Sequence, residues 1–215
     1  YFCTGFVRTA VNSWWVIYLL DVWGVGKNTA LFGTLAVLLP LTAFFGSFAS
    51  GLASDKFFKG RRAPVATCIY LLEAAIILLA ALFSAGVIPG GTALVLSILL
   101  VGINITCNSS HSIIGTAAAM DLGGRKMAGF AAGVIDSFQY FGAMLAGFGL
   151  GSVLDRFATP SVDPAGNPIL DNVGNQVTHI SGTVWFGAML PWALLGATFM
   201  GFLWIAHRNK STPGT

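Results

Sequence analysis

Residues 63–85 read APVATCIYLLEAAIILLAALFSA, a segment in which Glu73 is the one charged residue. An α-helix rises about 1.5 Å per residue, so about 20 apolar residues cross a hydrocarbon core roughly 30 Å thick. Inside lipid the backbone groups must bond to each other, and a helix satisfies them within one segment. The stretch therefore predicts a membrane-spanning helix.

Five more segments of the chain share this apolar character. The six predicted spans are 2–20, 29–53, 63–85, 92–117, 128–154 and 184–206. Hydrophobic residues make up 55% of the chain and charged residues 9%, and the mean hydropathy is +0.79. Soluble domains carry about 25% charged residues, so this composition excludes a water-facing surface. We predict an all-α membrane protein with six transmembrane helices, in which residues 1–215 form one unit.

The chain starts at Tyr1, and its first apolar segment lacks both the charged flank and the small-residue cleavage site of a signal peptide. We interpret this segment as a span whose upstream flank is missing, and expect the chain to be part of a longer protein.

The basic residues are distributed unevenly between the two sides of the predicted membrane. One side holds Lys56, Lys59, Arg61, Arg62, Arg125, Lys126, Arg208 and Lys210, and the other holds Lys27 and Arg156. The positive-inside rule places the basic loops and the C-terminus in the cytoplasm. We expect a plasma membrane protein, or a bacterial inner-membrane protein if the source is bacterial. The long loop 155–182 then lies outside; Val177–Ile180 is expected to add a short strand, and no function is assigned to the loop.

Arg8 is the most informative charged residue within a span. A charged group at the bilayer centre costs about 2.5–3.5 kcal/mol on insertion scales. Arginine stays protonated, and its planar group of donors binds phosphate or carboxylate in a bidentate manner. The alternative is an arginine that extends to the membrane surface. Asn12 and Trp15 follow on the same side of the helix, which predicts a partly polar face.

A second polar stripe runs along span 92–117, where Asn104, Asn108 and His111 share one face at i, i+4 and i+7. Hydrogen bonds between helices would account for single members, but a wet substrate cavity explains the whole stripe better. We therefore predict that these three residues bind substrate.

Span 128–154 carries a third polar cluster, Asp136, Gln139 and Tyr140, which we also assign to the substrate site. Asp136 is expected to pair with Arg8 or His111, or to carry a proton. Glu73 stands alone among apolar residues; it is expected to be protonated or bonded to a backbone group, and a direct substrate role is disfavoured.

Glycines on span 128–154 predict close helix packing. Gly129 and Gly133 are four residues apart, a spacing at which small residues let two helix backbones approach. The three cysteines lie one each in three apolar segments and are interpreted as buried small hydrophobic residues.

The loop between the second and third spans contains a separate motif. A gating role is predicted for Gly51, Asp55, Lys56, Gly60, Arg61 and Arg62. An acid at the C-terminal end of one helix and arginines at the N-terminal start of the next are both placed against the helix dipole. A pair between Asp55 and these arginines would offset both placements and could hold one state of a transporter.

At this loop the chain resembles the major facilitator superfamily, whose motif runs Gly-x-x-x-Asp-Arg/Lys-x-Gly-Arg-Arg. The chain has two extra residues before Gly60, and its form SDKFFKGRRAP resembles the organophosphate:phosphate antiporter branch, which includes glycerol-3-phosphate and hexose-phosphate transporters. Arg8, Trp14 and Tyr18 hold the spacing of that branch on helix seven.

The resemblance implies that the chain is the C-terminal half of a twelve-helix transporter and that its partner is the N-terminal six-helix half. It also implies that Arg8 binds the phosphate of the substrate together with a second arginine from that half. The long loop 155–182 departs from the compact pattern of these antiporters.

Three functions compete. The first is exchange of a phosphorylated metabolite for inorganic phosphate by alternating access. The second is a membrane sensor of the same fold, which binds sugar phosphate without transporting it. The third is a proton-coupled organic anion carrier in which Asp136 carries the proton. The sequence shows no nucleophile–base pair, metal cluster or phosphate-loop motif. We therefore predict no enzyme activity, cofactor, metal or nucleic-acid partner.

Overall fold

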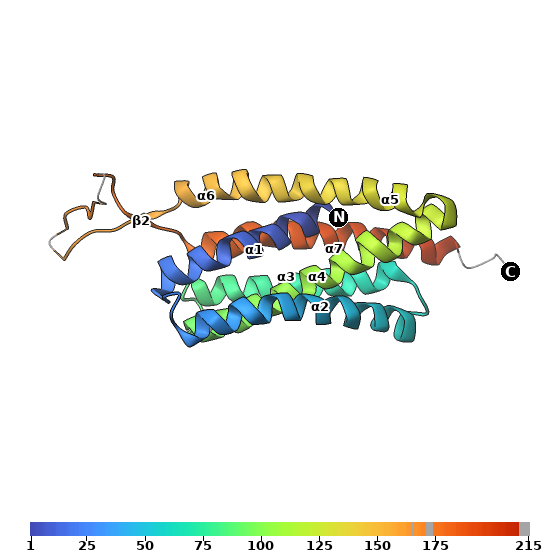
Figure 1. The fold of residues 1–215 in the computed structure, drawn as a ribbon, viewed down its shortest axis with the longest axis horizontal. Helices are drawn as coiled ribbons and strands as arrows, with labels where there is room; N and C mark the ends of the chain where they lie inside the picture. Colours follow the sequence, from blue (N-terminus) through green and yellow to red (C-terminus); the bar gives the residue numbers. More distant parts are fainter. Residues whose placement is uncertain (165, 171–173, 211–215) are drawn as a thin grey trace.

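The computed structural model describes residues 1–164, 166–170 and 174–210, except for the side chains of 121, 122, 125 and 207–210. Long helices run side by side along the molecule (Figure 1). The helices are α1 (Phe2–Trp23), α2 (Ala30–Phe58), α3 (Arg62–Ser84), α4 (Ala93–His111), α5 (Ala119–Met144), α6 (Leu150–Arg156) and α7 (Gly182–Lys210). Two π-helical turns, η1 (Ser112–Ala118) and η2 (Leu145–Gly149), join α4 to α5 and α5 to α6.

All six predicted spans fall on helices. Within the described residues, four helices are long and apolar enough to cross a membrane: α2, α3, Ala93–Ala118 and Gly182–Ala206. The predicted spans 2–20 and 128–154 are helical too, but they carry polar groups such as Arg8 and Asp136 that lower their hydropathy. Membrane crossing by these two stretches stays a prediction.

The helix ends are set by local chemistry. Thr29 and Thr92 cap α2 and α4, because their side chains accept hydrogen bonds from Phe32 N and Val95 N. Helix α2 continues to Phe58, beyond the predicted end at 53, so that the turn to α3 is shorter than expected. The turn contains Gly60 at φ 77°, a left-handed conformation that glycine adopts without strain.

The loops divide between the two ends of the bundle (Figure 1). The α2–α3 turn, the η1–α5 region and the C-terminal end of α7 lie at one end, and a hairpin extends from the other. The hairpin pairs β1 (Thr159–Pro160) with β2 (Thr178–His179), which confirms the predicted strand. Asp21 at the end of α1 holds this hairpin, because its carboxylate accepts hydrogen bonds from His179 Nδ1 at 2.7 Å and Ile180 N at 2.6 Å.

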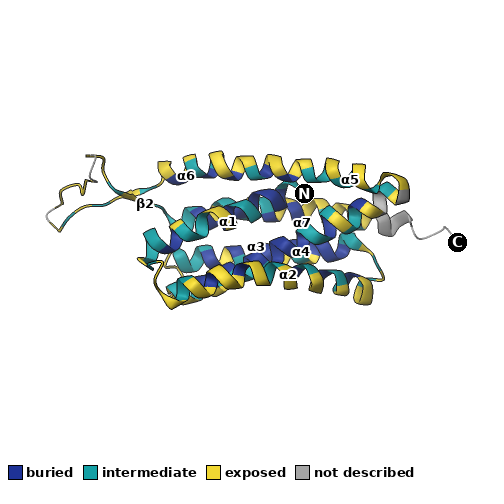
Figure 2. Cartoon of the chain, viewed as in Figure 1, coloured by how far each residue is buried: buried dark blue, intermediate teal, exposed yellow. Residues whose placement is uncertain are grey.

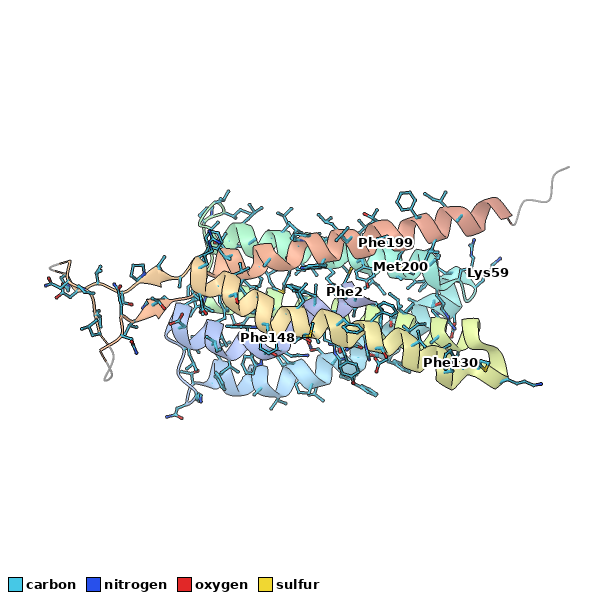
Figure 3. The ribbon with its side chains drawn as sticks, turned by 90° about the horizontal axis from the view of Figure 1, so that it is seen from above. Phe2, Lys59, Phe130, Phe148, Phe199 and Met200 are labelled. Carbon is cyan, nitrogen blue, oxygen red and sulfur yellow. The ribbon has the colours of Figure 1, made fainter. Side chains whose placement is uncertain are left out.

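The core lies between α1, α3, α4 and α7. Tyr18, Trp185 and Phe186 are fully buried there and pack ring against ring. Exposed residues instead follow α2 and the α5–α6 stretch (Figure 2). Figure 3 labels Phe130 and Phe148 along this stretch, and they are 68% and 82% exposed. Large apolar side chains on the outside are expected where the surroundings are lipid or another apolar helix.

Helices α1 and α5 come close at two glycines. A Cβ atom on Gly5 would collide with the backbone of Gln139, and one on Gly142 would collide with the backbone of Phe2. Within the described chain, nothing lies within 4 Å of a Cβ built on Gly129 or Gly133. The predicted close packing therefore occurs on the same helix, but at Gly142, about two and a half turns beyond Gly133, and on a different face.

We expect Gly142→Ala to destabilise the protein by about 1–3 kcal/mol, because the new methyl group overpacks the contact with α1. Gly133→Ala is the matched control, since it adds the same methyl group to the same helix in open space. Thermal unfolding in detergent should show a lower Tm for Gly142→Ala alone. Equal Tm values for the two variants would contradict this account of the α1–α5 contact.

Candidate functional site

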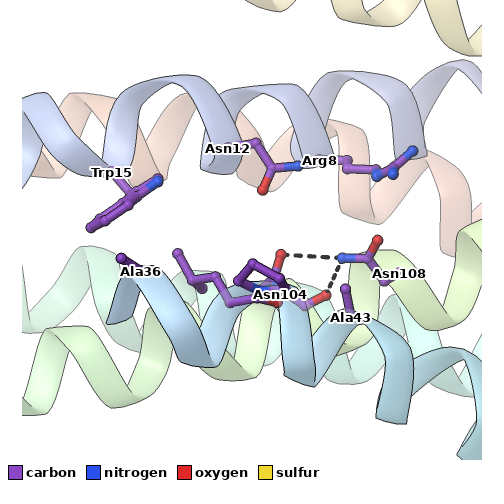
Figure 4. Close-up of a pocket in the computed structure, with 9 residues that line it drawn as sticks. Arg8, Asn12, Trp15, Ala36, Ala43, Asn104 and Asn108 are labelled. Carbon is purple, nitrogen blue, oxygen red and sulfur yellow. Dashed lines mark hydrogen bonds between the residues drawn. The ribbon is translucent and has the colours of Figure 1, made fainter. Parts of the chain in front are cut away.

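A cavity of about 280 Å³ lies between α1, α2 and α4 (Figure 4). It is lined by Arg8, Asn12, Trp15, Ala36, Leu39, Pro40, Ala43, Asn104 and Asn108. Five of these residues were predicted from the sequence to bind substrate. Helix α1 contributes one face at i, i+4 and i+7, as the spacing of Arg8, Asn12 and Trp15 predicted.

The two asparagines that α4 contributes to the cavity are engaged with the protein itself. Asn104 is 1% exposed, and its Nδ2 donates to Leu39 O at 2.7 Å and Thr42 Oγ1 at 3.1 Å. Asn108 Nδ2 donates to Asn104 O at 2.8 Å and Asn104 Oδ1 at 3.1 Å (Figure 4). The polar stripe of α4 therefore ties α4 to α2 as well as lining the cavity.

Arg8 extends from the cavity into a polar cluster formed with α5. The amide of Gln139 is satisfied when its oxygen accepts from Arg8 Nη1 at 2.8 Å. In that orientation its nitrogen, which has two hydrogens, lies within donating distance of Asp136 Oδ1 at 3.0 Å, the Tyr1 hydroxyl at 3.0 Å and His111 Nδ1 at 3.1 Å. The close approach of α1 and α5 makes this possible, because Gly5 lies one turn before Arg8 and faces the backbone of Gln139.

The charge of Arg8 has no counterion in the described part of the chain. No carboxylate is paired with its guanidinium, and Asp136 reaches it only through the neutral amide of Gln139. Its Nε is also buried without a hydrogen-bond partner. A half-buried cation whose buried Nε donor is unused, beside a cavity, is suited to bind an anion, because a charge-assisted bond would compensate for its desolvation.

Other predicted site residues lie as follows. His111, Asp136 and Gln139 join Arg8 in the polar cluster, whereas Tyr140 is 68% exposed and lies apart from it. Adjacent helix residues point about 100° apart, so Gln139 and Tyr140 do not share a face. The sequence reasoning missed Tyr1, although its i, i+7 spacing to Arg8 puts both on one face of α1.

The predicted pair at the α2–α3 turn forms between Asp55 and Arg62. Arg62 Nη1 lies 2.9 Å from Asp55 Oδ1 and donates to Ser54 Oγ at 2.8 Å. Arg61 instead donates its Nε to Phe58 O at 3.4 Å. The Asp55 side chain is 68% exposed, so this ion pair contributes roughly 0–1 kcal/mol to stability.

We expect Asn104→Leu to destabilise the fold by about 0.6–1.7 kcal/mol, because it removes the hydrogen bonds that join α4 to α2. Asn12→Leu is the matched control, since Asn12 lines the same cavity but its side chain is exposed. Thermal unfolding of both variants in detergent checks the difference. An equal loss in both would argue against a structural role for Asn104.

Comparison with known proteins adds a functional context. No family model matches the chain. The chain is 34% identical over 151 residues to the membrane sensor protein UhpC of Escherichia coli, which covers 70% of the chain and 33% of that protein. It is 32% identical over 157 residues to the glycerol-3-phosphate transporter of Bacillus subtilis, covering 71% and 33%. It is 33% identical over 153 residues to a probable hexose phosphate transport protein of Chlamydia pneumoniae, covering 69% and 31%.

The apolar helices and these similarities indicate an integral membrane protein. The chain is similar, more particularly, to organophosphate transporters and to a membrane sensor, which confirms the resemblance that the loop motif and Arg8 predicted. These relatives are transporters or sensors rather than enzymes. The chain matches about a third of the length of each of them.

Proposed function

We propose that the chain is the C-terminal six-helix half of a twelve-helix facilitator. In this proposal the protein exchanges a phosphorylated metabolite, such as glycerol phosphate or a sugar phosphate, for inorganic phosphate by alternating access. The observation that carries it is the unpaired guanidinium of Arg8 beside a cavity, in a chain similar to phosphate-ester transporters.

The chemistry of Arg8 supports exchange between two phosphate compounds. The phosphate group is common to the ester and to inorganic phosphate, and a guanidinium binds it through two parallel hydrogen bonds. Arg8 would therefore hold either ligand, while the rest of the cavity accommodates the organic part. Asn12 and Trp15 supply a hydrogen-bonding group and an apolar surface for that part.

The size and openness of the site support a partner half. A volume of about 280 Å³ lies just below the range of ligand pockets, which span roughly 300–1,000 Å³. Asn12 and the neighbouring Ser13 are exposed on α1. An N-terminal six-helix half would cover this polar face and complete the cavity, as expected where the substrate binds between two repeats near the membrane midplane.

Replacing Arg8 by Lys should reduce phosphate exchange roughly 10- to 100-fold, because a charge-assisted bidentate contact contributes about 1.5–3 kcal/mol. Arg156→Lys is the matched control, since Arg156 is an exposed arginine at the end of α6. Uptake of radiolabelled inorganic phosphate into vesicles preloaded with phosphate is the measurement. Unchanged uptake by Arg8→Lys at equal protein levels would refute the assignment.

The Asp55–Arg62 pair would hold the cytoplasmic end in one state. The positive-inside rule puts this turn in the cytoplasm, and the pair joins the ends of two helices that would separate there. An exposed ion pair is weak enough to break during each cycle.

We expect Asp55→Arg to slow exchange with less than about 1 kcal/mol change in stability. The double variant Asp55→Arg/Arg62→Asp restores the pair with its charges reversed and should recover exchange. Exchange rates and Tm values of the three proteins give the test. Failure of the double variant to exceed the single one would exclude a latch made by this ion pair.

A sensor is the second candidate, because one of the similar proteins is a membrane sensor at 34% identity. Both functions need a phosphate-binding Arg8, so binding alone does not separate them. A transporter exchanges internal for external phosphate in reconstituted vesicles. A sensor binds the ester and exchanges none.

A further inference from the structure

Glu73, in the middle of α3, has no role in the cavity and no partner in the described chain. Its side chain is 0% exposed, and neither carboxyl oxygen forms a hydrogen bond. The sequence left two interpretations, protonation or a bond to a neighbouring backbone group. Since no bond is formed among the described residues, only the first is compatible with this arrangement.

Among the described residues, no positively charged side chain is paired with Glu73. The titratable groups that interact with it are Cys3 on α1, Tyr70 on α3 and Cys107 on α4. On the other elements packed against α3, residues 182–206 of α7 and all of η1 contain no titratable side chain. The titratable residues of α2, Asp55 and Lys56, stand at its far end.

Burial without a partner disfavours the charged form of the Glu73 side chain. An unpaired carboxylate in such a place costs several kcal/mol more than in water, whereas the neutral acid avoids most of that cost. Glu73 is therefore a carboxylic acid in this conformation. It can become a carboxylate only after water or a cation reaches it, which requires the helices around it to move.

A chain of hydroxyl groups lies one helical turn from Glu73. The hydroxyl of Tyr70, three residues earlier on α3, is 2.5 Å from Thr4 Oγ1 on α1, and that oxygen is 3.5 Å from Ser110 Oγ on α4. All three residues are buried. Hydroxyl groups both donate and accept hydrogen bonds, so a proton can pass along these three groups, although no hydrogen bond among the described residues joins them to Glu73.

We propose that Glu73 is a proton-binding site whose occupancy changes with the position of α1 against α3 and α4. In the packed state the group is the acid. When the helices separate, the O–H bond breaks, the proton passes to water, and the carboxylate remains; the reverse step takes a proton from water and no other bond changes. Helix α1 also carries Arg8, so phosphate binding and proton release would be coupled.

Infrared difference spectroscopy of the full-length protein in lipid tests the site itself. Subtracting the spectrum of Glu73→Gln from that of the unchanged protein should reveal the carbonyl band of a protonated carboxyl group. Asp155→Asn, which alters an exposed acid at the end of α6, should leave this band in place. Adding inorganic phosphate should diminish the band in the unchanged protein. Absence of the band, or a band that phosphate leaves unaltered, would overturn the proposal.

The coupling is tested in vesicles that contain a pH-sensitive dye. Phosphate exchange by the unchanged protein should vary several-fold between pH 6 and pH 8, and Glu73→Gln should reduce this variation to the part that comes from the titration of phosphate itself and of His111, while phosphate binding persists. Glu73→Met is the second variant, because its side chain has similar length and cannot titrate. Exchange by Glu73→Gln or Glu73→Met that depends on pH as in the unchanged protein would refute the coupling.

This inference rests on the proposed transport function only for the vesicle experiment. If the infrared band is present and responds to phosphate but no exchange occurs, the transport proposal fails and the proton site stands. If exchange occurs and the band is absent, the proton site at Glu73 is refuted and the transport proposal stands.

Discussion

Arg8 brings a permanent positive charge into an apolar bundle, and the group that faces it is the neutral amide of Gln139 rather than a carboxylate. An amide oxygen compensates only part of the desolvation of a guanidinium, so an attraction for anions remains. This balance depends on the backbones of α1 and α5, which touch at Gly5 and Gly142 and leave no room for another side chain between them. The close packing of α1 and α5 therefore also determines which group faces the charge of Arg8.

The helices and the main site residues follow from the sequence because they depend on local rules. Apolar length predicts a span, and the i, i+4, i+7 spacing places Arg8 and Asn12 on one face. The hydrogen-bond partners of these residues do not follow from the sequence. Spacing along α4 identifies Asn104 as polar and inward, but its bond to Leu39 depends on which helix lies beside it. The spacing along α4 was equally compatible with a residue that lines a cavity and with one that bonds to another helix. Asn104 does both.

The glycines of α5 show the same limit. Gly129 and Gly133 have the small-residue spacing typical of close contacts, yet the contact with α1 uses Gly142. All three lie on one helix, and only the position of α1 decides which face is covered. Glu73 could not be resolved from sequence for a similar reason, because the absence of a partner is a property of every neighbouring helix together.

The tether between Asp21 and the hairpin has a mechanical consequence. Its two hydrogen bonds fasten the extended loop to the same helix that carries Arg8, about four turns further along. Any tilt of α1 must either drag the hairpin with it or break both bonds. The hairpin therefore moves with α1 as long as both bonds hold. A fluorescent label on the hairpin would report the tilt of α1 from outside the bundle.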